Sequence, residues 1–192
     1  MTSPHPPDAA ILEVVPYSPG ALSAWANQVL EHLDAAGQEG AAAVSFIKNR
    51  NVKIGFRKQK STGAMWSLNG NIYLNANNYS LATPSTNAFM LSLVAHEALH
   101  LQQGLLTALS VYGELVAWQL GFRIYQTLGG QLFSSALNEI MELQVRYDRE
   151  MLKKVRFLMQ EYAGKEYRID LLPLFPAWKE LGYLFAGKIP DA

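Results

Sequence analysis

Residues 84–104 read PSTNAFMLSLVAHEALHLQQG and form an unusually apolar part of the chain. Thr83 followed by Pro84 is typical of a helix N-cap and a first helical residue, and Gly104 is a typical terminator. We therefore expect one helix over 84–103. Most of its positions are apolar or small, and a helix that is apolar on nearly all sides must be buried. This segment predicts the central helix of the core.

Inside this helix lies the motif His96-Glu97-Ala98-Leu99-His100. Residues four apart on a helix lie on the same face, so both imidazoles can reach one ion. Glu97 lies beside them, where a carboxylate can take a proton from a zinc-bound water without binding the metal. The alternative is that each histidine is satisfied by its own hydrogen bond in the core, which would need several separate partners. We predict that His96 and His100 bind Zn²⁺ and that Glu97 is the general base.

The third ligand follows largely by elimination. The chain has no cysteine, and no histidine lies after His100, so an acidic residue must complete the set. No aspartate occurs between Asp34 and Asp148, and the first glutamate after the motif is Glu114. It stands early in a second strong helix that we expect over about 110–128. Glu114 is therefore the predicted third ligand. The alternative is a carboxylate that the helix dipole favours in the first turn.

Before the motif, the sequence predicts a small sheet. Residues 52–57 alternate apolar and polar side chains, which is the period of a strand with one solvated face. Residues 64–68 and 71–75 flank Asn69-Gly70, the dipeptide best suited to a tight type I′ hairpin turn. We expect these three strands to form one antiparallel sheet.

The motif followed by Glu114-x-x-Ala117 on the next helix resembles the gluzincin clan of zinc peptidases. The order of helices, small antiparallel sheet, motif helix and glutamate helix also resembles its minimal members. The resemblance covers roughly residues 52–128. It implies two histidine ligands, a glutamate ligand, a fourth position that holds water, and Ala117 packed against the motif helix. The spacing from His100 to Glu114 is shorter than in thermolysin-like members, so a full thermolysin architecture is not implied.

The same resemblance implies where a substrate would bind. In zincin peptidases the hairpin before the motif helix supplies an edge strand to which the substrate adds in extended form. By that analogy, main-chain groups around Met65, Trp66 and Ser67 are the candidate substrate-binding groups; a plain structural strand is the alternative. Gluzincins often stabilise the oxyanion with a later tyrosine or histidine. The sequence does not choose among the later tyrosines, which are Tyr112, Tyr125, Tyr147, Tyr162 and Tyr167.

The remaining helices follow from apolar periodicity. We expect helices over 21–36 and through 41–47, then a long helix over about 134–163, a loop and a short closing helix. The first residues are rich in proline, which favours an extended or mobile lead-in. The predicted organisation is a flexible lead-in over 1–20 and a single zincin-like domain over 21–192.

Composition limits the classes of function. The chain has 192 residues, of which 49% are hydrophobic, enough for one substantial core. Lys and Arg number 16, as do Asp and Glu, so no net charge attracts nucleic acid. No signal peptide or membrane span is visible, because acidic residues interrupt the apolar stretches. We therefore expect a cytoplasmic protein whose partner is a peptide or protein substrate.

Together these features predict an α+β fold that is mostly helical and zincin-like, with a small three-stranded antiparallel sheet before the motif helix. The expected function is a zinc metallopeptidase that hydrolyses peptide bonds. One alternative is a zincin-shaped module that binds metal for regulation or interaction, with little or no turnover. Another is a metal-free helical protein in which the motif is accidental. Metal content tests the latter, and the effect of changing Glu97 tests the former.

Overall fold

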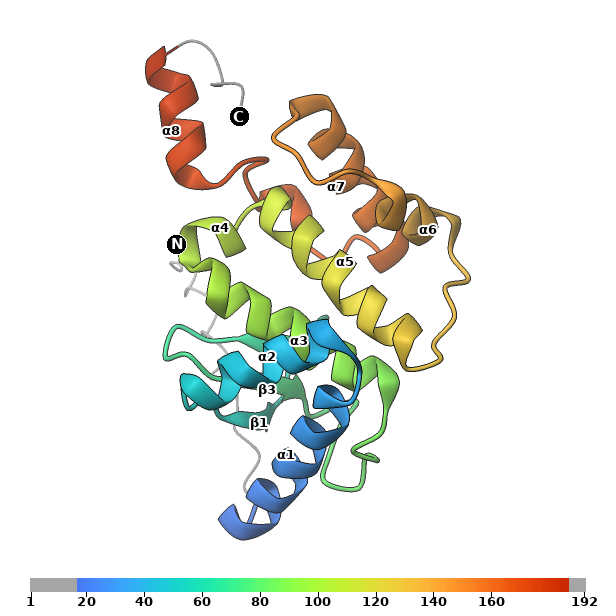
Figure 1. Ribbon diagram of the computed structural model, residues 1–192. Helices are drawn as coiled ribbons and strands as arrows, with labels where there is room; N and C mark the ends of the chain where they lie inside the picture. Colours follow the sequence, from blue (N-terminus) through green and yellow to red (C-terminus); the bar gives the residue numbers. More distant parts are fainter. Residues whose placement is uncertain (1–16, 187–192) are drawn as a thin grey trace, which may run out of the picture.

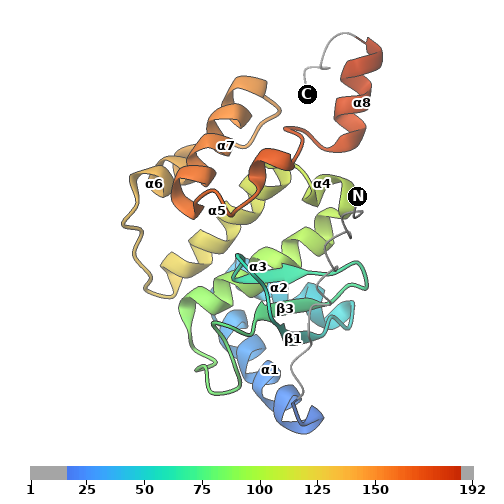
Figure 2. The same cartoon turned by 180° about the vertical axis from the view of Figure 1, so that it is seen from behind.

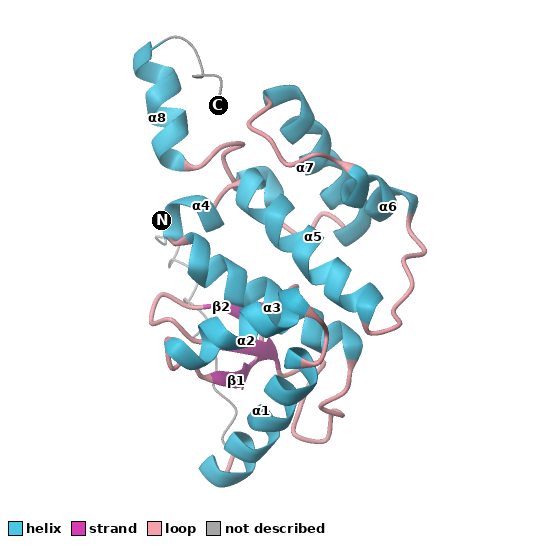
Figure 3. Cartoon of the chain, viewed as in Figure 1, coloured by secondary structure: helices cyan, strands magenta, loops and turns pink. Residues whose placement is uncertain are grey.

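The computed structural model describes residues 17–186, which are mostly helical with one small sheet (Figure 1, Figure 3). This agrees with the predicted α+β class. The predicted lead-in up to residue 16, and residues 187–192, lie outside the described residues. The described elements are, in chain order, α1 (Pro19–Asp34), α2 (Gln38–Asn49), β1 (Ile54–Arg57), β2 (Ala64–Trp66), β3 (Ile72–Asn75), α3 (Ala88–Gln103), α4 (Leu105–Ala108), α5 (Val111–Thr127), α6 (Ser135–Glu142), α7 (Arg149–Ala163), the 3-10 helix η1 (Ile169–Leu171) and α8 (Ala177–Ala186).

The first helix, α1, begins two residues earlier than predicted because Ser18 caps it. The Ser18 hydroxyl accepts a hydrogen bond from the Ala21 amide at 3.2 Å, and Pro19 takes the first helical position, where its missing N–H costs nothing. α1 and α2 pack on each other, and both contact α3. The indole of Trp25 in α1 donates to the Thr83 carbonyl at 2.9 Å, which fixes the loop before α3.

The sheet is mixed, so the prediction of a purely antiparallel sheet is wrong. The strand order is β1-β3-β2, with β3 parallel to β1 and antiparallel to β2. The connection from β1 to β2 crosses the end of β3, where Asn75 holds it. The Asn75 side chain accepts from the Gln59 amide at 3.1 Å and donates to the Thr62 carbonyl at 2.7 Å. β3 is thereby the central strand, and its Ile72 and Leu74 are fully buried.

The predicted hairpin between β2 and β3 is present, but its turn is not type I′. A type I′ turn needs positive φ at both central residues, and Asn51 is the only non-glycine residue in the described chain with positive φ. Instead, the Ser67 carbonyl accepts from the Gly70 amide at 2.8 Å, and Gly70 has a φ of 80°. The connection is a three-residue loop that ends with glycine in a left-handed conformation, a common alternative.

The motif helix, α3, begins at Ala88, four residues later than predicted. The Asn87 side chain caps it by accepting from the Met90 amide at 2.9 Å. The predicted cap, Thr83, is engaged elsewhere, because its hydroxyl accepts a hydrogen bond from an amide of the preceding loop. The end of the helix before Gly104 is as predicted.

The long helix predicted over 134–163 is two helices, α6 and α7, separated by residues 143–148. Gln119 of α5 accounts for the end of α6, because its side-chain amide donates to two carbonyls there, each at 2.8 Å. These carbonyls therefore have a hydrogen-bond donor without a further turn of α6. Asp148 then caps α7, since its side chain accepts from an amide in the first turn of that helix.

Two buried clusters lie on either side of the pair formed by α3 and α5, which run side by side through the middle of the molecule (Figure 2). The first cluster joins α1, α2, the sheet and α3. The second joins α5, α6, α7 and η1. The contact between α3 and α5 therefore lies where the two halves of the protein meet. Within residues 17–186, no helix combines the length and the hydropathy that a membrane crossing requires.

Candidate metal centre

The candidate site is built where α3 and α5 lie close together. His96 and His100 lie on consecutive turns of α3, and Glu114 lies in the first turn of α5. Gly121 allows the helices to approach, because a Cβ atom there would lie 3.2 Å from the Ser92 carbonyl oxygen. A carboxylate of α5 can therefore reach the imidazoles of α3.

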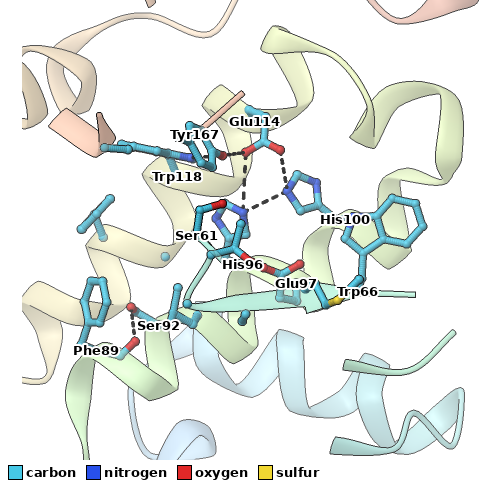
Figure 4. Close-up of a pocket in the computed structure, with 18 of the residues that line it drawn as sticks. Ser61, Trp66, Phe89, Ser92, His96, Glu97, His100, Glu114, Trp118 and Tyr167 are labelled. Carbon is cyan, nitrogen blue, oxygen red and sulfur yellow. Dashed lines mark hydrogen bonds and ion pairs between the residues drawn. The ribbon is translucent and has the colours of Figure 1, made fainter. Parts of the chain in front are cut away.

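The structure brings the three predicted ligands together (Figure 4). The Nε2 atoms of His96 and His100 are 2.9 Å apart. The Oε2 atom of Glu114 lies 3.7 Å from His96 Nε2, and its Oε1 atom lies 3.4 Å from His100 Nε2. One ligand atom from each residue lies within 4.8 Å of the other two. His96, His100 and Glu114 could thus hold one metal ion.

A hydrogen bond to its outer nitrogen orients the His100 ring. His100 Nδ1 lies 3.0 Å from the side-chain oxygen of Gln103, whose amide nitrogen donates to the Gly113 carbonyl at 3.0 Å. Because the Gln103 oxygen is an acceptor, His100 Nδ1 carries the hydrogen. With Nδ1 protonated, the neutral His100 ring presents the lone pair of its Nε2 atom toward His96 and Glu114, as a metal ligand must. The Ala117 backbone lies next to the His96 ring and favours its protonated form, which opposes the lowering of the His96 pKa.

Burial and proximity set the charges of these groups. Burial, and then the neighbouring His100, lower the pKa of His96 to about 4. Burial alone would also lower the pKa of His100, but the Glu114 carboxylate raises it above its ordinary value. Burial would raise the pKa of Glu114, yet the two imidazoles and Tyr167 hold it below its ordinary value. The ionised carboxylate makes this buried centre attractive to a cation.

Glu97 follows His96 on α3, but it is not one of the three residues that could hold the ion. Its side chain is buried, and burial raises its pKa to about 7. The His100 ring and a hydrogen bond with the Trp66 backbone oppose that increase, whereas Glu114 adds to it. A carboxyl group with a pKa near neutrality can both accept and return a proton at pH 7. Glu97 is thus suited to the proton transfer predicted for it.

The ligands open onto a cleft of about 310 Å³ bounded by α3, α5, β2 and the end of α7. The wall beside the ligands is largely apolar. Phe89 and Leu93 contribute to it from α3, and Trp118 and Phe122 contribute from α5. The cleft is therefore suited to hold an apolar side chain next to the candidate metal centre.

The strand β2 borders this cleft and has one unpaired edge. Of the residues predicted to bind a substrate, Met65 and Trp66 line the cleft, whereas Ser67 does not. Ser67 lies in the hairpin turn, where its amide donates to the Asn71 carbonyl at 2.9 Å. Main-chain groups alternate along an antiparallel strand, so Met65 bonds toward β3. The groups at the free edge belong to Ala64 and Trp66.

The structure separates the five tyrosines considered for oxyanion stabilisation. Tyr162 and Tyr167 line the cleft. Tyr112 and Tyr147 stack on each other in the second cluster, with ring centroids 4.3 Å apart. Tyr125 lines a neighbouring pocket. Only the first two are therefore placed near the ligands.

Tyr167 contacts a ligand directly, which the sequence does not reveal. Its hydroxyl donates to Glu114 Oε2 at 2.5 Å and accepts from Trp118 Nε1 at 3.0 Å. Burial and the Glu114 carboxylate raise the pKa of Tyr167 well above its ordinary value, so the phenol stays protonated. The residue is 53 positions from Glu114 along the chain, and no motif marks it.

Replacing Glu114 by alanine is expected to weaken zinc binding by more than about a hundredfold, because it removes a ligand rather than an outer hydrogen bond, whose loss costs about tenfold to a hundredfold. Zinc affinity is measured by competition with a chromophoric chelator. Glu139→Ala and Glu142→Ala are the matched controls, since both residues lie on α6 outside the site. Weaker binding in either control, with Glu114→Ala unaffected, would reassign the ligand.

Comparison of the chain with family models, with curated proteins and with solved structures gave no match. The resemblance to gluzincins therefore rests on the motif, the downstream glutamate and the arrangement of the residues described above. What the site does has to be inferred from its own chemistry.

Proposed function

We propose that this protein is a zinc metallopeptidase of the gluzincin type. The observation that carries the proposal is the convergence of two imidazole Nε2 atoms and a carboxylate at one largely buried place, where the Gln103 oxygen keeps His100 Nδ1 protonated. Groups with lone pairs directed at one point are costly to bury without a cation between them. A metal ion is the cation that suits this donor set.

Zinc is the proposed ion because two imidazoles and one carboxylate are a common ligand set of catalytic zinc sites with an open fourth position. When bound, zinc would lower the pKa of a water molecule and polarise a carbonyl group. His96, His100 and Glu114 would hold it. Gln103 would keep the His100 ring in the orientation and tautomer that binding requires.

Glu97 is proposed to move the proton of the reaction. Its carboxylate takes a proton from the attacking water as the water oxygen bonds to the carbonyl carbon of the peptide. The same proton then passes from Glu97 to the amide nitrogen as the carbon–nitrogen bond breaks, so the products are a carboxylic acid and an amine. Burial raises the pKa of Glu97 and so makes its carboxylate a stronger base for the first transfer.

The free edge of β2 is proposed to bind the peptide in extended form. Ala64 and Trp66 offer main-chain groups on that edge, and Trp66 also contacts Glu97 through its backbone. The apolar wall formed by Leu93 and Phe122 would receive a large apolar side chain of the substrate. The proposed substrate is therefore an unstructured peptide segment that contains apolar residues.

Hydrolysis of an unstructured protein is expected to stop when a chelator removes the metal and to return when zinc is added. The reason is that the ligands bind the ion reversibly, and that without the ion the pKa of the attacking water is too high for Glu97 to take its proton efficiently. The measurement follows fragments by mass spectrometry before chelation, after chelation and after restoring zinc. A zinc-loaded protein that cleaves nothing in a broad peptide library would replace the peptidase by the metal-binding module.

A further inference from the structure

We infer that Tyr167 is a positioning residue that engages one oxygen of Glu114 and leaves the other for the metal ion. The inference rests on the proposed function, because it concerns the same site. It starts from the different contacts of the two oxygens of the Glu114 carboxylate. Oε2 accepts the hydrogen bond from the Tyr167 hydroxyl at 2.5 Å and lies 3.7 Å from His96 Nε2, whereas Oε1 has no bond from Tyr167 and lies closer to a ligand, 3.4 Å from His100 Nε2.

The direction of the hydrogen bond is fixed by Trp118. An indole N–H can only donate, so the Tyr167 oxygen must accept from Trp118 Nε1, which lies 3.0 Å away. The single hydrogen of the phenol is then free to point only toward Glu114. The chain of donors therefore runs from Trp118 through Tyr167 to Glu114, and it ends on Oε2.

Rigid surroundings keep the phenol in this place. Tyr167 follows α7 in a turn that begins at Gly164, whose φ of 81° favours glycine. The Tyr167 amide donates to the Gly164 carbonyl at 3.1 Å, which closes the turn. The Tyr167 ring also packs against the Trp118 ring, with centroids 5.5 Å apart. The segment after α7 thus brings a fixed donor to a ligand on α5.

The consequence is that Glu114 acts as a one-oxygen ligand with a set orientation. A carboxylate free to rotate can offer both oxygens to an ion, which fills a position that water or substrate needs. Tyr167 prevents this by competing for Oε2. Its loss should therefore weaken metal binding and change the set of groups around the ion.

Tyr167→Phe tests the inference because it removes the hydroxyl and keeps the ring. We expect the dissociation constant for zinc, measured with a competing chelator, to rise by about tenfold to a hundredfold. We also expect the visible absorption spectrum of the cobalt(II) form to change, because that spectrum reports the number and geometry of the ligands. Trp118→Phe should have a smaller effect in both measurements, since it leaves the phenol in place.

The matched control is Tyr162→Phe, which removes a hydroxyl from the same cleft without touching Glu114. It should leave zinc affinity and the cobalt(II) spectrum unchanged, and far-ultraviolet circular dichroism should be the same for all variants. The inference is overturned if Tyr167→Phe binds zinc as tightly as the parent with the same cobalt(II) spectrum, or if Tyr162→Phe has an equal effect. A parent protein that binds neither metal would overturn the proposed function as well, so the two failures are distinguishable.

Discussion

Glu97→Gln is expected to reduce the rate of peptide hydrolysis by about 10² to 10⁴-fold, the usual contribution of a general base. Glutamine keeps the size of the side chain and can still hydrogen-bond a water molecule, but it cannot take a proton. Glu97 is buried and lies outside the ligand group, so the variant should still fold and bind zinc. Rates are measured on the same unstructured substrate at equal zinc content.

The control for this variant is Glu139→Gln, which makes the same chemical change at a half-exposed glutamate. Glu139 lies on α6, outside the ligand group, and forms an ion pair with Lys154. It should cleave at the parental rate. If the Glu97 variant instead cleaved as fast as the parent, the catalytic role of Glu97 would be wrong. A metal-binding module with a different occupant of the cleft would then become the better account.

The histidines and Glu114 can be predicted from the sequence because their positions depend on local geometry and on elimination. Helical periodicity places His96 and His100 on one face regardless of the rest of the chain. The same reasoning extends to Gln103, which lies three residues after His100 and bonds to its Nδ1. Glu114 lies on another helix, so local periodicity alone does not place it near the histidines. The contact between α3 and α5 brings them together in the structure.

The order of the strands depends on contacts that no local pattern encodes. Alternation predicts a strand over 52–57, and Asn69-Gly70 predicts a hairpin, but neither indicates which arm of the hairpin β1 joins. The connection after β1 is bound at the end of β3 by Asn75, whose side chain accepts from the Gln59 amide, 16 residues away in the sequence. A sheet predicted from successive strands is therefore antiparallel by default, whereas the observed sheet is mixed.

The break between α6 and α7 combines a local signal with a distant one. Asp148 is a typical N-cap, so the start of α7 can be read from the sequence. The apolar period continues through the break and obscures it. The end of α6 depends on Gln119, whose side chain reaches a carbonyl 24 residues further along the chain. Side chains that end a helix from a neighbouring helix leave no mark in the sequence of the helix they end.

Replacing both His96 and His100 by alanine is expected to abolish stabilisation by zinc. An ion that binds only the folded state raises the free energy of unfolding by about 4 kcal/mol at about a thousand times its dissociation constant. For a chain of this size, that corresponds to a melting temperature about 8 to 16 °C higher. Scanning calorimetry with and without zinc should show this increase for the parent and none for the double variant.

His32→Ala is the control, because His32 lies on α1 outside the ligand group. It should keep the full response to zinc.

A second comparison separates loss of metal from loss of folding. His100 is buried, and alanine there removes its hydrogen bond with Gln103 and an imidazole beside the Glu114 carboxylate. The metal-free double variant should therefore melt below the metal-free parent, and each protein's response to zinc is measured from its own metal-free melting temperature. If zinc raised its melting temperature as much as that of the parent, the ion would have to bind elsewhere, and the site between α3 and α5 would lose its proposed role.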